Sequence, residues 1–133
     1  MSPCAIHLDP AEGKISDSDE EKVSEIEIFH FNDVYEVEPR DREPVGGVAR
    51  FIGKIKSFPD AMVLFSGDCL APSLISTVTK GEHMVRFINM MGISAACIGN
   101  HDFDFGAEHL AEECVKKTAF PWLLSNARDR RTG

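Results

Sequence analysis

The sequence has 133 residues, 43% of them hydrophobic, and carries a formal net charge of −8 at neutral pH. This length suits one small domain with its own hydrophobic core. Because the basic residues are scattered and the total charge is acidic, the composition argues against a nucleic-acid-binding surface. No apolar run approaches the roughly 20 residues that a membrane-spanning helix needs.

Residues 1–24 are predicted to form a disordered acidic extension. Residues 1–25 hold seven acids and two bases, with the acids concentrated in residues 17–21. Such a segment cannot bury enough apolar area to offset the entropy cost of ordering it. The first residues contain neither the basic nor the apolar stretch of a signal peptide, so we expect a cytoplasmic protein.

The four cysteines show no paired spacing such as C-x-x-C, which makes a zinc–thiolate site improbable. Their pattern fits free thiols in a reducing compartment. Cys97 lies within an apolar run and is predicted to be a buried free thiol.

Residues 25–133 are predicted to alternate between strands and helices as a layered α/β fold. The strands are expected at 25–31, 61–66, 93–98 and 120–124, and the helices at 48–58, 81–91 and 107–117. Met90 and Met91 are expected to fill the core, and the helix at 107–117 is expected to bury Leu110 and Cys114, with Ala111 left open. The strand at 61–66 is apolar throughout, as expected for a strand that is covered on both faces. Four strands leave an open sheet edge, which suggests part of a larger domain.

Polar side chains follow three of the predicted strands at the points where the strands end. Asp33 comes after the first strand, Asp68 after the second, and Asn100 after the third. If the strands are parallel neighbours, these side chains converge at one edge of the sheet. Converging carboxylates repel one another, and a divalent metal ion is the usual compensation. The simpler alternative is a set of Asn/Asp-rich turns that cap the following helices.

Three ordered motifs carry a family resemblance: His-Phe-Asn-Asp at 30–33, Ser-Gly-Asp at 66–68 and Gly-Asn-His-Asp-Phe-Asp-Phe-Gly at 99–106. Together they resemble the calcineurin-like metallophosphoesterases and, within them, the 5′-nucleotidase family. The resemblance covers roughly residues 25–133. It implies the β-α-β-α-β-α-β portion of an α/β/β/α sandwich, namely the N-terminal half of the catalytic domain.

The resemblance also implies roles for individual residues. Asp33 would bind a first divalent metal ion, Asp68 would bridge two ions, and Asn100 would bind the second. His101 would stabilise or protonate the leaving group of a phosphomonoester, and Asp104 would orient it. The two ions would be Mn, Mg, Zn or Fe, and the substrate would be a phosphomonoester such as a nucleoside 5′-monophosphate.

Two departures from the family pattern are the residue at position 35 and the absence of the family's later histidine ligands from this sequence. Tyr35 occupies the position where the family usually has a histidine ligand, and neutral tyrosine is a poor ligand. Asp102 is not assigned by the motif and is expected either to support the site or to cap the next helix. The family's later histidine ligands lie beyond this sequence. His30 is expected to be a core histidine, and His83 and His109 are expected to have no functional role.

Three hypotheses therefore remain. The first is a metal-dependent phosphoesterase of which this chain, tested alone, would be inactive or weak. The second is a truncated or degenerate module that acts in binding or assembly. The third is a site completed between two chains, which an open sheet edge would allow.

Overall fold

The computed structural model describes residues 24–128 and residue 130, so the acidic extension predicted for 1–24 lies outside the described residues apart from Ser24. Four strands form one parallel sheet in the order β1-β2-β3-β4. Their bounds are Ile28–Phe31 for β1, Met62–Phe65 for β2, Ala95–Cys97 for β3 and Trp122–Leu123 for β4. All four predicted strands are present, and each is shorter than its apolar run.

The helices occupy the connections between strands. They are α1 (Val48–Lys56), α2 (Leu74–Thr79), α3 (Glu82–Asn89) and α4 (Ala107–His109). The sequence analysis assigned no element to α2, which begins with a reciprocal capping box between Ser73 and Ser76. In the described part of the chain, no helix is long and apolar enough to cross a membrane.

The helix predicted for 107–117 does not form as one regular helix. Its α-helical part is α4, and the chain then continues as a wide π-helical turn over Leu110–Cys114 and a 3₁₀ turn over Val115–Lys117. The wide turn still buries Leu110 and Cys114, as the apolar pattern indicated. Ala111, which the pattern had left open as a buried position, is exposed.

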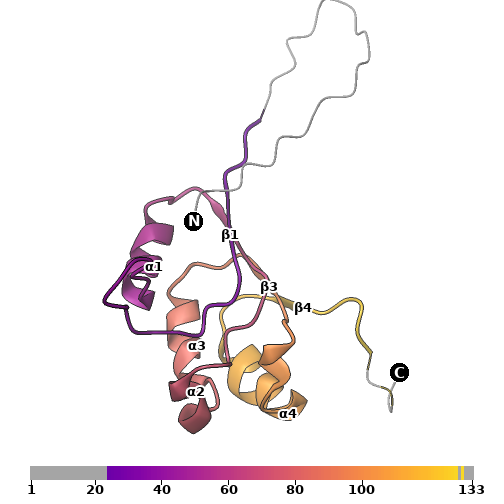
Figure 1. Ribbon diagram of the computed structural model, residues 1–133. Coiled ribbons are helices and arrows are strands. Elements are labelled where there is room, and N and C mark those ends of the chain that lie inside the picture. The colour runs from indigo at the N-terminus through magenta and orange to yellow at the C-terminus, as the bar shows by residue number, and fades with distance from the viewer. Residues whose placement is uncertain (1–23, 129, 131–133) are drawn as a thin grey trace, which may run out of the picture.

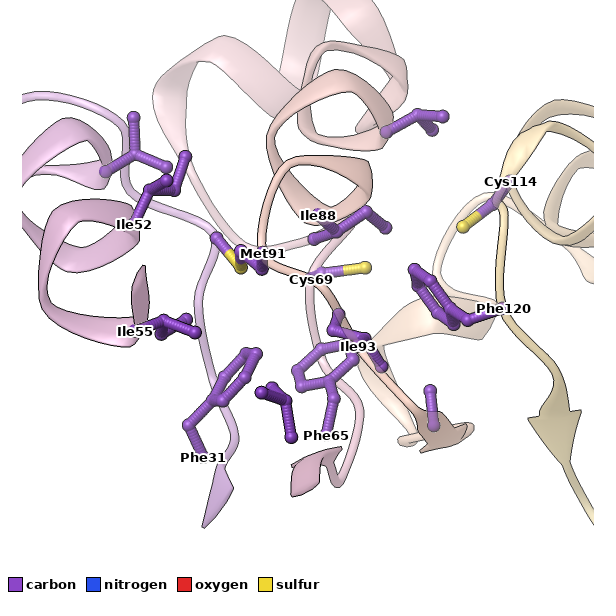
Figure 2. Close-up of a cluster of buried hydrophobic side chains, with 14 of the residues drawn as sticks. Phe31, Ile52, Ile55, Phe65, Cys69, Ile88, Met91, Ile93, Cys114 and Phe120 are labelled. Atoms are coloured by element: carbon purple, nitrogen blue, oxygen red, sulfur yellow. The ribbon is translucent and has the colours of Figure 1, made fainter. Parts of the chain in front are cut away.

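The hydrophobic core lies between the sheet and the helices, which all lie on one side of the strands (Figure 1). Figure 2 shows Ile52 and Ile55 of α1 and Ile88 of α3 facing Phe31 and Phe65 of the strands. The rings of Phe31 and Phe65 stack with centroids 4.9 Å apart. These contacts hold the carboxyl ends of β1 and β2 in register.

The other face of the sheet is uncovered in the described residues, so within this part of the chain β2 is covered on one face, not on the two predicted. Side chains alternate along each strand, so Val63 and Phe65 point to the helices while Met62 points away. The uncovered face exposes Ile28 by 51%, Met62 by 44% and Leu123 by 50%. A continuous apolar run alone does not show how many faces of its strand are covered.

Three further predictions of burial are wrong. Cys97 is exposed because it alternates with buried Ala96 and points to the uncovered face. His30 is also exposed, and its imidazole Nε2 lies 2.6 Å from the Ser66 hydroxyl. Met90 was expected to fill the core with Met91, but it follows the last turn of α3 and is 52% exposed, whereas Met91 is buried.

Candidate functional site

The carboxyl ends of β1 and β2 bring two aspartates together through backbone hydrogen bonds. The amide of Asp33 donates to the carbonyl of Gly67 at 3.1 Å, and the amide of Val34 donates to the carbonyl of Asp68 at 3.0 Å. Both aspartates have a positive φ, 56° for Asp33 and 63° for Asp68. Only asparagine and aspartate among non-glycine residues adopt this conformation readily, so the chain turns sharply at each strand end.

The loop after β3 joins the same edge of the sheet. The backbone amide of His101 donates to Oδ1 of Asp68 at 2.8 Å. Asn100 and His101 therefore lie beside the aspartate that follows β2. We call the set Asp33, Asp68, Asn100, His101 and Asp104 the carboxylate corner.

Gly67 allows the loops after β2 and β3 to approach each other. Its φ is +88°, and a Cβ atom at this position would lie 2.8 Å from the Cα of Gly99 and 2.9 Å from the carbonyl oxygen of Cys97. Both distances are too short for a side chain. The glycine of the Ser-Gly-Asp motif is thus required by backbone packing as well as by its own conformation.

The imidazole of His101 is hydrogen-bonded to the carboxylate of Asp104. Its ring Nδ1 lies 2.9 Å from Oδ2 of Asp104, and because a carboxylate only accepts, Nδ1 carries the donated proton. This hydrogen bond raises the pKa of His101 above its ordinary value of 6.5, with smaller contributions from the charges of Asp104, Asp68 and Asp33. The outer nitrogen, Nε2, is left available for a ligand.

Asp102 differs from Asp104 in burial and in hydrogen-bond partners. It is completely buried, and its carboxylate accepts hydrogen bonds from the backbone amides of Asp68, Cys69 and Gly99. The next helix, α4, begins without a side-chain cap, so the capping contact left open for Asp102 is not observed. Its hydrogen bonds join the loops after β2 and β3 instead. No pattern in the sequence separates these two aspartates, which lie two positions apart.

Two further predicted site residues differ in burial. Asn100 is exposed, and Tyr35 lies partly buried in the loop after β1. Asn32 was not among the predicted site residues, and its side-chain amide donates to Oδ2 of Asp33. An asparagine next to an aspartate is too common in turns to have indicated this contact.

The donors of the corner fit part of a divalent-metal site. Carboxylate and amide oxygens are the ligands that hard divalent ions accept. None of the ion pairs in the described part of the chain neutralises Asp33 or Asp68. Among those same residues, however, no three histidine, cysteine, aspartate or glutamate side chains form a metal-binding group. The corner therefore offers donors without a complete coordination shell of its own.

A hollow of the described surface lies away from the corner, between α2, α3 and α4. Its volume is about 650 Å³. We call it the histidine hollow, and its lining comprises Val78, Thr79, Lys80, Glu82, His83, His109 and Glu113. His83 Nδ1 lies 2.7 Å from the Thr79 hydroxyl, and His109 Nε2 donates to the carbonyl of Lys80 at 2.8 Å. Both histidines lie in the hollow and not in the corner.

Sequence comparison relates the chain to known enzymes, although no family model matches it. The chain is 32% identical to a 5′-nucleotidase of Rattus norvegicus over 120 residues, covering 80% of this chain and 21% of that protein. It is 32% identical to a 5′-nucleotidase of Homo sapiens and 33% identical to a snake venom 5′-nucleotidase of Gloydius brevicauda. The chain spans about a fifth of the length of these relatives.

Structural comparison agrees at the level of the fold. The chain resembles the calcineurin-like phosphoesterase YfkN from Bacillus subtilis with a TM-score of 0.55 and 17% sequence identity. The match covers 79% of this chain and 39% of YfkN. The α/β metallophosphatase-type fold expected from the three motifs is thereby confirmed for this portion.

Proposed function

Because the chain belongs to the 5′-nucleotidase family of calcineurin-like phosphoesterases, we propose that it supplies part of a metal-dependent phosphomonoesterase site. The observation that carries the proposal is the carboxylate corner, where Asp68 accepts from the backbone of His101 and His101 is paired with Asp104. Carboxylate oxygens and an imidazole that is hydrogen-bonded to a carboxylate thus lie together where the strands of the sheet end. The substrate would be a phosphomonoester, with nucleoside 5′-monophosphates the first class to test.

Asp33, Asp68 and the side-chain oxygen of Asn100 would hold divalent ions. Such ions, when bound, neutralise phosphate charge and make a bound water more acidic. The chain's own contribution begins with its negative charge: Asp33 and Asp68 have no cationic side chain paired with them in the described part. Two unpaired carboxylates at one edge favour a bound cation over a bare phosphate.

His101 would act on the leaving group. Its Nδ1 proton is donated to Asp104, so Nε2 faces outward and carries the transferable proton when the ring is charged. The raised pKa of His101 keeps a larger fraction of the ring protonated near neutral pH. Nε2 would therefore stabilise the phosphate and protonate the departing oxygen.

The test is Mn²⁺-dependent release of phosphate from an aryl phosphate and from a nucleoside 5′-monophosphate by the purified chain. The general-acid role predicts that His101→Ala lowers the rate by about 100-fold or more, while His109→Ala, in the histidine hollow, leaves it unchanged. Equal rates in His101→Ala and the parent protein would contradict the role of His101.

Mn²⁺ binding, measured by calorimetry, tests the metal ligands even if hydrolysis by the chain alone is weak. Asp68→Asn should weaken binding at least about tenfold, because it removes a charged ligand. His109→Ala again serves as the control. Mn²⁺ binding that is unaffected by Asp68→Asn would overturn the proposed site.

A second candidate function is a non-catalytic binding or assembly module. The uncovered sheet face favours it, because Ile28, Met62 and Leu123 expose apolar surface there. This role would require no metal. Hydrolysis and Mn²⁺ binding would both be absent, and Met62→Lys would change the association state measured by light scattering.

A further inference from the structure

Asp102 forms an unusually complete set of contacts for a carboxylate. Its Oδ2 accepts from the backbone amides of Asp68 and Gly99, both at 2.9 Å. Its Oδ1 accepts from the amides of Cys69 at 2.8 Å and Leu70 at 3.3 Å. The residue is 0% exposed. One buried side chain therefore satisfies four backbone donors that belong to two different loops.

These four amides lie outside the strands and helices, so they make none of the hydrogen bonds of a strand ladder or a helix. They lie where β2 and β3 have ended and the chain turns, and a buried amide without an acceptor is costly. A carboxylate is well suited to the position because both of its oxygens only accept. An asparagine of the same shape would present an amide group to one pair of donors and lose those bonds.

The contacts between the two loops run in both directions. Asp102, in the loop after β3, accepts from the amide of Asp68 in the loop after β2. Asp68 in turn accepts, through its own Oδ1, from the amide of His101. The two aspartates thus fasten one loop to the other, and Asp68 is held in its left-handed conformation with its carboxylate directed at the loop after β3.

We infer that Asp102 is a positioning residue that aligns Asp68 with Asn100 and His101 by fastening the loops after β2 and β3. This inference rests on the proposed function for its consequence, the placement of metal ligands. It assigns the two acids of the Asp-Phe-Asp sequence different tasks: Asp104 orients the imidazole of His101, and Asp102 orients the backbone that carries the ligands.

Amide hydrogen exchange of the unaltered chain provides the first test, and it requires no metal. The amides of Asp68, Cys69, Leu70 and Gly99 should exchange at least about tenfold more slowly than the exposed-loop amide of Asp41, because each is hydrogen-bonded to a buried group. Exchange of these four amides at the rate of Asp41 would overturn the inference. This outcome does not depend on how any variant folds.

The variant Asp102→Asn provides the second test, with Asp60→Asn, an exposed turn residue, as the charge-matched control. We expect Asp102→Asn to speed exchange of at least two of the four amides by about tenfold, while the amide of Ile88 in α3 stays protected. Mn²⁺ affinity should fall at least about tenfold in Asp102→Asn and not in Asp60→Asn.

The two measurements separate the possible failures. Unchanged exchange in a folded Asp102→Asn variant would overturn the fastening of the loops. Faster exchange with undiminished Mn²⁺ affinity would overturn the positioning of the ligands. If the unaltered chain binds no Mn²⁺ while its four amides are protected, the proposed metal site fails and the fastening of the loops stands.

Discussion

The carboxylate corner and the histidine hollow each contain histidines beside acids, but they differ in what the histidines contact. In the corner, His101 is hydrogen-bonded to the carboxylate of Asp104 and its pKa is raised. In the hollow, His83 is hydrogen-bonded to the neutral Thr79 hydroxyl, and burial lowers its pKa despite the nearby charge of Glu36. His83 is thus hydrogen-bonded to a neutral group, whereas His101 is hydrogen-bonded to a carboxylate.

The corner is formed by backbone contacts between loops, whereas the hollow lies between packed helices. Thr79 donates its hydroxyl proton to the carbonyl of Ile75, so His83 must donate from Nδ1. The other ring nitrogen of His83 is buried and has no partner within the described residues. A buried ring nitrogen without a partner disfavours protonation of the imidazole, but it does not by itself indicate a bound ligand.

The largest expected effect comes from disturbing the close backbone approach in the corner. Gly67→Ala places a Cβ atom against Gly99 at a positive φ, and we expect a loss of about 2–4 kcal/mol in unfolding free energy. Gly53→Ala is the matched control, since a Cβ atom there meets nothing and alanine favours the helix by about 0.5–1 kcal/mol. Urea denaturation measures both. Equal stability of the two variants would show that the loops separate without cost.

A smaller effect is expected on the titration of His101. Asp104→Asn removes the hydrogen-bonded carboxylate that is the main cause of the raised pKa, so the pKa of His101 should fall toward 6.5. Glu113→Gln, in the histidine hollow, should leave the pKa of His101 unchanged. Proton NMR of the imidazole ring during a pH titration measures both changes. An unchanged pKa of His101 in Asp104→Asn would contradict the assignment of its raised pKa to the Asp104 carboxylate.

The smallest expected effect is a difference in how stability depends on pH. For His83 the folded pKa lies below 6.5, so the unfolded chain takes up the proton first and stability falls as pH decreases from 6.5 through the folded value. For His101 the sign is opposite: the stabilising contribution is present below 6.5 and is lost as pH rises through the raised pKa.

The variant His83→Gln tests this difference. It should flatten the decline of unfolding free energy below pH 6.5, because glutamine does not titrate in that range. His101→Gln should instead flatten the decline above that pH. Urea denaturation at a series of pH values provides the measurement. If both variants change the unfolding free energy on the same side of pH 6.5, the predicted difference between the two histidines is wrong.

Much of the fold was predictable because apolar periodicity reports which elements form. The four strands, α1 and α3 were predicted, and the buried positions of α1 follow its three-to-four-residue spacing. The ends of strands were less predictable, because Ile26 and Ile98 extend apolar runs beyond the hydrogen-bonded ladders. The predicted helix at 107–117 differed because its apolar spacing does not distinguish an α-helical from a π-helical turn.

The chemical groups that follow each strand can be read from the amino-acid order: the aspartates after β1 and β2, and the Asn-His pair after β3. Parallel strands make such groups neighbours, so the convergence was predictable. Only the tertiary structure decided that Asp102 is buried and Asp104 exposed, and that Cys97 and His30 face outward. The reason is that burial depends on which sheet face and which loop a residue meets, and those neighbours are distant in sequence.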